Sequence, residues 1–343
     1  MPKLSPANRR LVELDALRGI AALTVVLFHY TTRFDELYGH AAAPAFSVPW
    51  GHYGVNLFFM ISGFVIFMTL ARTRRIADFV VSRFSRLYPA YWAAIALTLA
   101  ITGQLDLPGK TVGTTTALAN LLMFHGLFNV PNVDGVYWTL LVELVFYSWS
   151  LLAFAMGLLN RIHAILIVAL LLRWVYFVAA SGFGIELSWT ISQLLNLPYI
   201  AWFACGIMIY RLTHNSDSPR KDLAIILAAI GTLGIVESAG LAALAAALSL
   251  VLYLAGSSHL KLLRLAVFVW LGDISYTLYL LHENIGWALM LQMKAHGINT
   301  TVSVIVTLLV AFGLASLVTR TVEKPAMAWI RGQYKKRRLA ISQ

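Results

Sequence analysis

Apolar stretches of about 20 residues recur along nearly the whole chain, from residue 14 to residue 321. A helix of that length spans the hydrocarbon core of a bilayer. Hydrophobic residues make up 59% of the 343 residues and charged residues 12%, against roughly 45–50% and 25% in globular proteins. So few charged groups cannot cover a surface in water. The sequence therefore excludes a water-soluble fold and predicts an all-α, polytopic bundle of transmembrane helices.

Counting about 20 apolar residues per crossing predicts ten helices. Their expected ranges are 14–31, 53–71, 87–103, 136–158, 162–181, 194–212, 221–238, 240–256, 269–292 and 300–321. The apolar stretch 114–128 is short, and we expect an interfacial or re-entrant segment there. Without an internal repeat or a soluble domain, the chain is expected to form one membrane domain over residues 1–330, followed by a basic cytoplasmic tail over 331–343.

The placement of basic residues gives an independent test of this count, because cytoplasmic loops hold the excess of Lys and Arg. With both termini in the cytoplasm, nearly all of the 26 Lys and Arg residues fall in cytoplasmic segments. The exceptions are Arg33, Lys110, Arg173 and Lys294. An eleventh crossing would destroy this pattern. The formal net charge of +11 thus follows from topology and does not indicate nucleic acid. We expect the basic tail, residues 335–338, to lie against anionic lipid headgroups.

Few ionisable side chains lie inside the expected helices, where each costs about 2.5–3.5 kcal/mol to insert, so each is a candidate for function. They are Arg18, His29, Glu143, Arg173, Asp273 and His282. Arg18 and His29 are eleven residues apart, close to three helical turns. They therefore share one helix face, with about 16 Å between them along the axis.

His29, Glu143 and His282 are expected at a similar depth in the outer half of the membrane, given the alternating direction of the helices. Two imidazoles and a carboxylate at one level can exchange protons near neutral pH, as acid/base chemistry on a hydroxyl requires. The alternative is that Glu143 only neutralises a buried histidine and holds helices together. No spacing typical of metal ligands or of a phosphate-binding glycine loop occurs, so no metal is expected.

Two arginines stand at the cytoplasmic start of the third helix, in the segment Arg83-Phe-Ser-Arg86-Leu-Tyr-Pro89. At spacing i and i+3 they share one side of a helical turn, and guanidinium groups match phosphate oxygens in bidentate pairs. The pattern indicates an anion site at the inner face. Ordinary anchoring of a cytoplasmic loop is the alternative.

Five segments together resemble the acyltransferase-3 family of integral-membrane acyltransferases. They are Leu14-Asp15-Ala-Leu-Arg18-Gly19 with His29 eleven residues after the arginine, Asn56-Leu-Phe-Phe-Met-Ile-Ser62-Gly63, the Arg83 to Pro89 segment, Trp138-Thr-Leu-Leu-Val-Glu143-Leu-Val-Phe-Tyr147, and Ser275-Tyr276-Thr-Leu-Tyr279-Leu-Leu-His282. Their order and spacing agree over most of the chain. We expect no C-terminal hydrolase-like domain of the kind that often follows in this family.

The resemblance implies transfer of an acyl group, usually acetyl, from a coenzyme A thioester to a hydroxyl of a saccharide. Arg18, Arg83 and Arg86 are then expected to hold the donor's phosphates at the inner face. His29 is expected to act as general base or as acyl acceptor, with Glu143 orienting its ring. Tyr276, Tyr279 and His282, at i, i+3 and i+6, are expected to line the path of the acyl group or to contact the thioester oxygen. For the tyrosines, plain aromatic packing is the alternative.

The expected enzyme is thus an O-acetyltransferase of the cytoplasmic (inner) membrane. It would use acetyl-CoA to modify an extracytoplasmic or lipid-linked glycan, such as an exopolysaccharide or lipopolysaccharide. One alternative is a small hydrophobic acceptor, such as a macrolide, or a lipid. Another is a proton-coupled transporter that uses the same buried His and Glu side chains. Assembly into a homo-oligomer is left open by the sequence.

Overall fold

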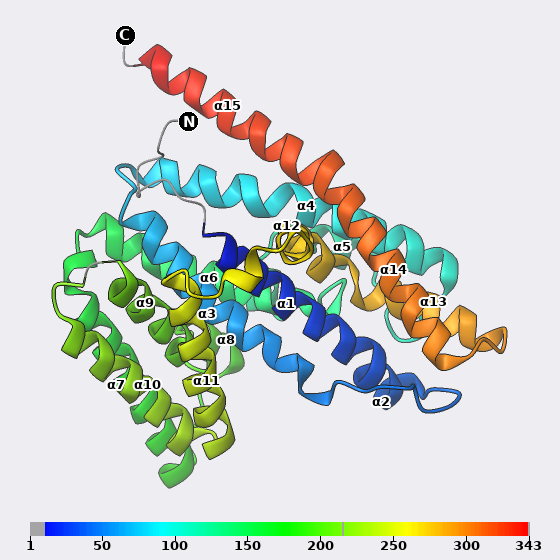
Figure 1. Cartoon of the computed structure of the whole chain (residues 1–343), viewed down its shortest axis with the longest axis horizontal. Helices are drawn as coiled ribbons and strands as arrows, with labels where there is room; N and C mark the ends of the chain where they lie inside the picture. The colour runs from blue at the N-terminus through cyan, green and yellow to red at the C-terminus, as the bar shows by residue number, and fades with distance from the viewer. Residues whose placement is uncertain (1–10, 215, 342–343) are drawn as a thin grey trace.

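The computed structural model describes residues 11–214 and 216–341, and every regular element within them is a helix (Figure 1). The expectation of an all-α fold is therefore confirmed for this part of the chain. The N-terminal basic residues Lys3, Arg9 and Arg10 lie outside the described residues.

The helices that build the bundle follow the apolar stretches of the sequence. They are α1 (Val12–Phe28), α3 (Gly54–Leu70), α4 (Ile76–Leu105), α6 (Trp138–Ala155), α7 (Ile162–Phe183), α9 (Ile200–Thr213), α10 (Pro219–Val236), α11 (Ala239–Gly256), α12 (Ala266–Leu281), α13 (Glu283–Ala295), α14 (Thr300–Val318) and α15 (Lys324–Ile341). Shorter helices connect them, namely α2 (Phe34–Tyr38), α5 (Thr114–Asn120) and α8 (Trp189–Leu194). Each of the ten expected ranges overlaps at least one of these helices.

Five helical stretches in the described residues are long and apolar enough to cross a bilayer. They are Pro49–Leu70, Gly135–Ala155, Leu159–Phe183, Ala239–Gly256 and Thr300–Ala340. The apolar helices Ile200–Thr213 and Ala266–Leu281 are shorter. The stretch 114–128 forms only α5 and a 3₁₀ turn, His125–Phe128. Ten crossings with both termini in the cytoplasm remain a prediction.

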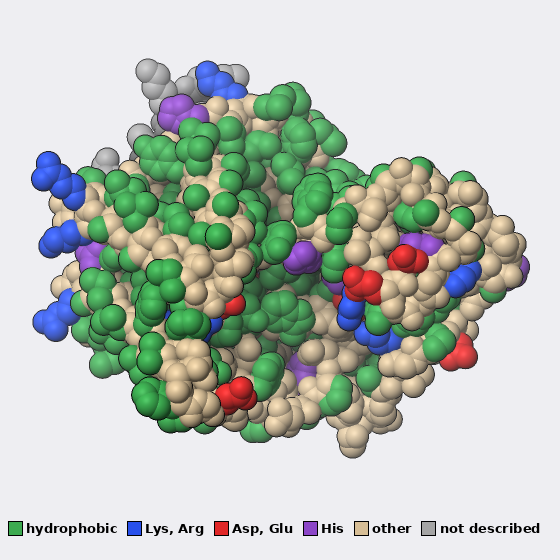
Figure 2. All heavy atoms as spheres, turned by 90° about the horizontal axis from the view of Figure 1, so that it is seen from below, with side chains coloured by type: hydrophobic (Ala, Val, Ile, Leu, Met, Phe, Trp, Pro, Cys, Tyr) green, Lys and Arg blue, Asp and Glu red, His purple; other side chains and the backbone are tan. Residues whose placement is uncertain are grey.

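The outer helices present apolar side chains away from the bundle. On α7, Val168, Leu171 and Val175 are 55%, 56% and 65% exposed, and their spacing places them along one face of the helix. Figure 2 shows one face of the molecule covered largely by hydrophobic side chains, with charged groups mainly near its margins and on the lobe at the right. In water such a surface would aggregate, whereas lipid chains can cover it.

Glycines bring the central helices into contact. A Cβ added at Gly19 of α1 would lie 2.6 Å from the backbone nitrogen of Gly272 on α12. A Cβ at Gly63 of α3 would lie 2.4 Å from the carbonyl oxygen of Phe203 on α9. Gly19 and Gly63 therefore allow close approach of the two backbones. Small residues at such crossings are the usual way in which membrane helices pack tightly.

The ninth expected helix, 269–292, is divided in the structure at His282, between α12 and α13. Side chains from a neighbouring segment enter its hydrogen-bond ladder. The backbone N–H of Asn284 donates to Asp134 Oδ2 (3.1 Å), and the carbonyl of Leu280 accepts a long bond from the Tyr137 hydroxyl (3.5 Å). Replacement of intrahelical partners by side chains is a known cause of helix breaks.

Helix α15 packs lengthwise against α4, and both cross the upper part of Figure 1. Arg331 donates through Nε to Ser85 Oγ (3.0 Å), and the Tyr334 hydroxyl donates to Asp78 Oδ1 (2.8 Å). The domain boundary expected at residue 330 falls inside this helix and remains a prediction.

The glycine crossing gives a first testable prediction. Gly19→Ala should lower the stability of the protein in detergent by about 1–3 kcal/mol, because the new methyl group must separate two packed backbones. Gly231→Ala on α10 is the control, since a Cβ there meets nothing within 4 Å. Thermal unfolding followed by size-exclusion chromatography measures both variants. Equal melting temperatures would contradict the close packing of α1 and α12.

Candidate active site

Three arginines predicted from the sequence line one cavity of about 540 Å³, which we call the arginine cavity. Arg18 comes from α1, and Arg83 and Arg86 come from the start of α4. Its other polar lining residues are Asp15, Ser62, Thr69, Glu143, Tyr147, Asp273, Lys324 and Arg331. The volume lies in the range of small-molecule sites. Arg18, Arg83 and Arg86 therefore line one cavity, as their predicted common role requires, and their binding of an anion remains a prediction.

The guanidinium groups in the arginine cavity differ in their partners. Arg86 forms an ion pair with Glu323, whose side chain is 1% exposed, and lies 5.8 Å from the centre of the Tyr276 ring. Arg83 donates through Nη2 to Ser82 Oγ (3.1 Å), while its buried Nε finds no hydrogen-bond partner among the described residues. Arg83 thus retains an unused donor beside the cavity, as expected of a group that awaits an anion.

Helix α15 and the turn before it close one side of the arginine cavity. Lys324 pairs with Asp273 of α12 (3.0 Å), and Arg331 reaches Ser85 of α4. Their contribution was missed in the sequence, where both residues counted only as cytoplasmic basic residues. Glu323 was missed as well, although a carboxylate in an otherwise basic segment is a visible signal.

A second, narrow cavity of about 30 Å³ continues from the first. Arg18, Phe58 and Glu143 line both cavities. The narrow cavity adds Thr139, Ser275, Tyr276 and Tyr279 to the lining. The Tyr276 hydroxyl donates to the Leu87 carbonyl (2.9 Å), and the oxygens of Thr139 and Tyr279 are 3.0 Å apart. Both tyrosines therefore line the passage while their hydroxyl groups are engaged by the protein.

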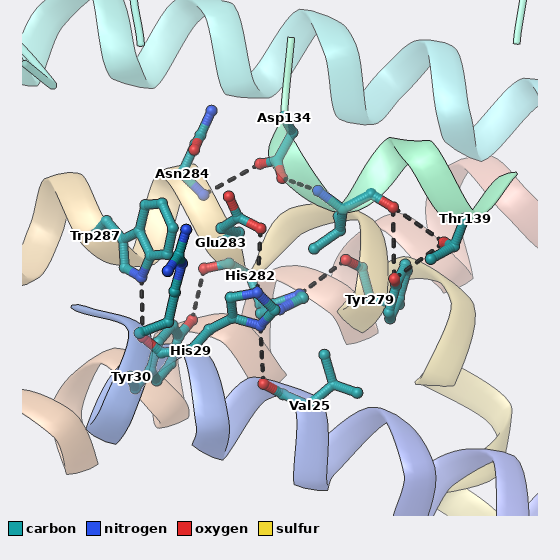
Figure 3. Close-up of polar contacts among 12 residues, drawn as sticks. Val25, His29, Tyr30, Asp134, Thr139, Tyr279, His282, Glu283, Asn284 and Trp287 are labelled. Carbon is teal, nitrogen blue, oxygen red and sulfur yellow. Dashed lines mark hydrogen bonds and ion pairs between the residues drawn. The ribbon is translucent and has the colours of Figure 1, made fainter. Parts of the chain in front are cut away.

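His29 lies at the other end of α1, where the helix widens into a π-helical turn, His29–Arg33. Such turns are often found at functional sites. The ring of His29 contacts His282 of the α12–α13 break, with 3.1 Å between His29 Nδ1 and His282 Nε2 (Figure 3). Glu283 Oε2 lies 3.3 Å from His29 Nε2. These three residues form what we call the histidine cluster.

Two reciprocal hydrogen bonds hold the backbones of the histidine cluster together. Trp287 Nε1 donates to the carbonyl of His29 (3.0 Å), and the Tyr30 hydroxyl donates to the carbonyl of His282 (2.9 Å). A Cβ at Gly286 would lie 2.4 Å from the Tyr30 oxygen, so this position leaves room only for glycine. The imidazole pair is therefore fixed by the protein.

Next to the cluster, Asp134 anchors the start of α13. It is fully buried and accepts hydrogen bonds from the backbone N–H groups of Asn284 and Val136. Burial raises the pKa of this carboxyl group above its ordinary value, and the two N–H groups act against that shift by stabilising the carboxylate. Asp134 thereby fixes the backbone next to Glu283.

The contacts correct one detail of the sequence analysis. Glu143 was expected to orient His29, but its Oε2 accepts from the Tyr147 hydroxyl (3.0 Å) and it lines the cavities that contain Arg18. The carboxylate in contact with His29 is Glu283. Residue counts along a helix give the depth of a residue and the face that it shares with other residues of that helix. They do not show which neighbouring helix that face contacts. Arg173, a candidate for function in the sequence, forms an ion pair with Glu237.

The helical bundle thus combines an arginine-lined cavity with a buried imidazole pair. The family model of the acyltransferase-3 type, described as an acyltransferase domain, matches residues 11–320. The chain therefore belongs to the acyltransferase-3 family, whose members are integral-membrane acyltransferases.

Two known proteins are similar to parts of the chain. Nodulation protein 10 of Rhizobium leguminosarum bv. viciae is 34% identical over 155 residues, which cover 39% of this chain and 41% of that protein. Protein 2 in the picA locus of Rhizobium radiobacter is 34% identical over 96 residues, or 26% of this chain and 45% of that protein. The matches thus span less than half the length of either relative. No solved structure matches the chain.

Proposed function

We propose that this acyltransferase moves an acetyl group from cytoplasmic acetyl-CoA to a sugar hydroxyl of an extracytoplasmic or lipid-linked glycan. The observation that carries the proposal is the arrangement along α1. Arg18 lines the arginine cavity, His29 belongs to the histidine cluster, and the narrow cavity runs from Arg18 to Tyr279, whose ring centre lies 5.7 Å from that of His282.

The arginine cavity suits the nucleotide end of acetyl-CoA. Arg18, Arg83 and Arg86, with Arg331 and Lys324, supply the positive charge that its phosphates require. The free Nε donor of Arg83 adds directional hydrogen bonding. The remaining arm of the donor is long and thin, and its extended length is similar to the 16 Å or so that separates Arg18 from His29 along a helix. The thioester would therefore reach the histidine cluster while the phosphates stay at the inner face.

The chemistry proposed at His29 is acyl transfer to oxygen. When bound, acetyl-CoA supplies an activated thioester carbonyl. His29 Nε2 takes the proton of the acceptor hydroxyl as the oxygen forms a bond to the acetyl carbon, the carbon–sulfur bond breaks, and the thiolate leaves with that proton. In the covalent route, Nε2 itself takes the acetyl group first and passes it to the hydroxyl oxygen. Both routes require an unprotonated Nε2.

The proposal also fixes a location and a set of partners. A donor made in the cytoplasm places the enzyme in the cytoplasmic (inner) membrane, with lipids around the bundle. The acceptor would approach the histidine cluster from the side of Lys110, whose amino group is 3.6 Å from Glu283 and is partly exposed. Polysaccharide units are the acceptor class that we favour, as the family membership suggests.

Donor binding gives the second prediction. Arg83→Ala should weaken binding of acetyl-CoA about 10-fold or more, because one charge-assisted contact to phosphate is lost. The matched control is Arg74→Ala, an exposed arginine in the preceding loop. Calorimetric titration of the purified protein in nanodiscs with acetyl-CoA measures both variants. If the wild-type protein does not bind acetyl-CoA, the result would contradict the proposed donor and favour a proton-coupled transporter.

The reaction gives the third prediction. His29→Ala should reduce acetyl transfer about 100-fold or more, since the group that handles the proton or the acetyl is gone. His296→Ala, which removes an exposed histidine at the end of α13, should leave transfer unchanged. Transfer of radiolabelled acetyl from acetyl-CoA to glycan extracted from the source membranes measures both. Full activity in folded His29→Ala protein would exclude the proposed mechanism.

A further inference from the structure

Glu283, which no motif in the sequence singled out, occupies a specific seat in the histidine cluster. It is the first residue of α13, its side chain is buried, and its Oε2 lies 3.3 Å from His29 Nε2. Its other oxygen, Oε1, lies 3.6 Å from the amino group of Lys110. The carboxylate thus stands between the imidazole and a cation from the loop before α5.

The hydrogen bonds of the two histidines determine which of their ring nitrogens carry a proton. His282 Nδ1 lies 2.8 Å from the carbonyl oxygen of Tyr279 and 3.2 Å from that of Leu278. A carbonyl oxygen only accepts, so His282 Nδ1 carries a proton and its Nε2 presents a lone pair. His29 Nδ1 lies 3.1 Å from His282 Nε2 and 2.9 Å from the carbonyl oxygen of Val25. Both of these atoms accept hydrogen bonds, so His29 Nδ1 carries a proton as well.

The unassigned nitrogen is therefore His29 Nε2, which is the one that faces Glu283 (Figure 3). We propose that Glu283 is the positioning residue of His29: its carboxylate stabilises the imidazolium that forms when Nε2 takes the hydroxyl proton, while His282 holds the ring through Nδ1. This inference rests on the proposed function, because it assigns a partner to the nitrogen that the reaction uses.

The position of the Glu283 carboxylate depends on Gly135, the first residue of the turn before α6. A Cβ at Gly135 would lie 2.2 Å from Glu283 Oε1 and 2.9 Å from Oε2. The atoms that it would strike are at the end of a flexible side chain, so an alanine there displaces the carboxylate while the backbone stays in place. The chain therefore offers a way to move this group without changing its charge or touching His29.

The charges around His29 set the direction of the expected pH effect. The groups that act on the ring are His282 from the α12–α13 break, Glu283 from α13, Lys110 from the loop before α5 and Arg33 from the π-helical turn that His29 begins. Asp134 lies behind Glu283, next to Asn284. Glu283 favours the protonated ring, whereas the cationic groups oppose it. Removing the carboxylate thus lets the ring lose its proton at lower pH, but leaves the cation formed during reaction without its partner.

Three variants in nanodiscs test this role through the pH dependence of coenzyme A release, with acetyl-CoA and source-membrane glycan as substrates. Glu283→Gln should lower kcat about 10-fold or more. It should leave the KM for acetyl-CoA within about threefold, and move the acidic limb of the kcat profile to lower pH by about one unit. Gly135→Ala should lower kcat in the same way, because a shift of about 1 Å is costly for an oriented group. Glu186→Gln, an exposed carboxylate, is the control and should match the wild type.

The outcomes distinguish a failure of the role proposed for Glu283 from a failure of the proposed acetyl transfer. Wild-type kcat and an unmoved acidic limb in folded Glu283→Gln protein would overturn the role of Glu283, as would a change confined to KM. If Glu283→Gln fails to fold, Gly135→Ala decides by the same criteria. The proposed function itself fails only if the wild type releases no coenzyme A with these substrates, or if His29→Ala is as active as the wild type.

Discussion

The close crossing of α1 and α12 is the constraint on which the rest of the site depends. Gly19 and Gly272 remove the side chains that would hold these helices apart. The resulting approach brings the end of α1 against the α12–α13 break, where the carbonyls of His29 and His282 each accept a hydrogen bond from an aromatic residue of the other segment. Two imidazoles can then lie 3.1 Å apart between fixed backbones. Without that crossing, Arg18 and His29 would remain on one helix, but His29 would lack its partner.

The helix packing also brings buried charged groups against partners of opposite charge. A buried carboxylate is tolerated only where a partner replaces water. The buried Glu323 pairs with Arg86 and the buried Glu13 pairs with Arg264, and each pair links segments distant in the sequence. Arg83 differs because its buried Nε has no hydrogen-bond partner in the part of the chain that the structure describes. A polar atom left in that state is costly for folding, so its retention beside a cavity supports the proposed binding of an anion there.

The sequence allowed the helical class, the approximate helix ranges and the joint cavity of Arg18, Arg83 and Arg86 to be predicted, because these depend on hydropathy and on helical spacing. It could not predict the division at His282, since that break comes from Asp134 and Tyr137, which lie about 150 residues away in the chain. It also paired His29 with the wrong carboxylate. Depth pointed to Glu143, and Glu283 was not considered. Only the rotation of each helix shows that Glu143 faces Tyr147 and the cavities whereas Glu283 faces His29.

The separation of the two carboxylates has a chemical consequence under the proposed mechanism. A carboxylate that stabilises a protonated imidazole must not lie against the donor's phosphates, because like charges would weaken donor binding. Glu143 lines the arginine cavity with Arg18 and Arg83, so its charge is offset there by cations. Glu283 lies near Lys110 and a partly exposed loop, and neither residue lines the arginine cavity. One helix thus carries an anion-binding end and a proton-handling end, and the distance between Arg18 and His29 keeps their opposite electrostatic requirements apart.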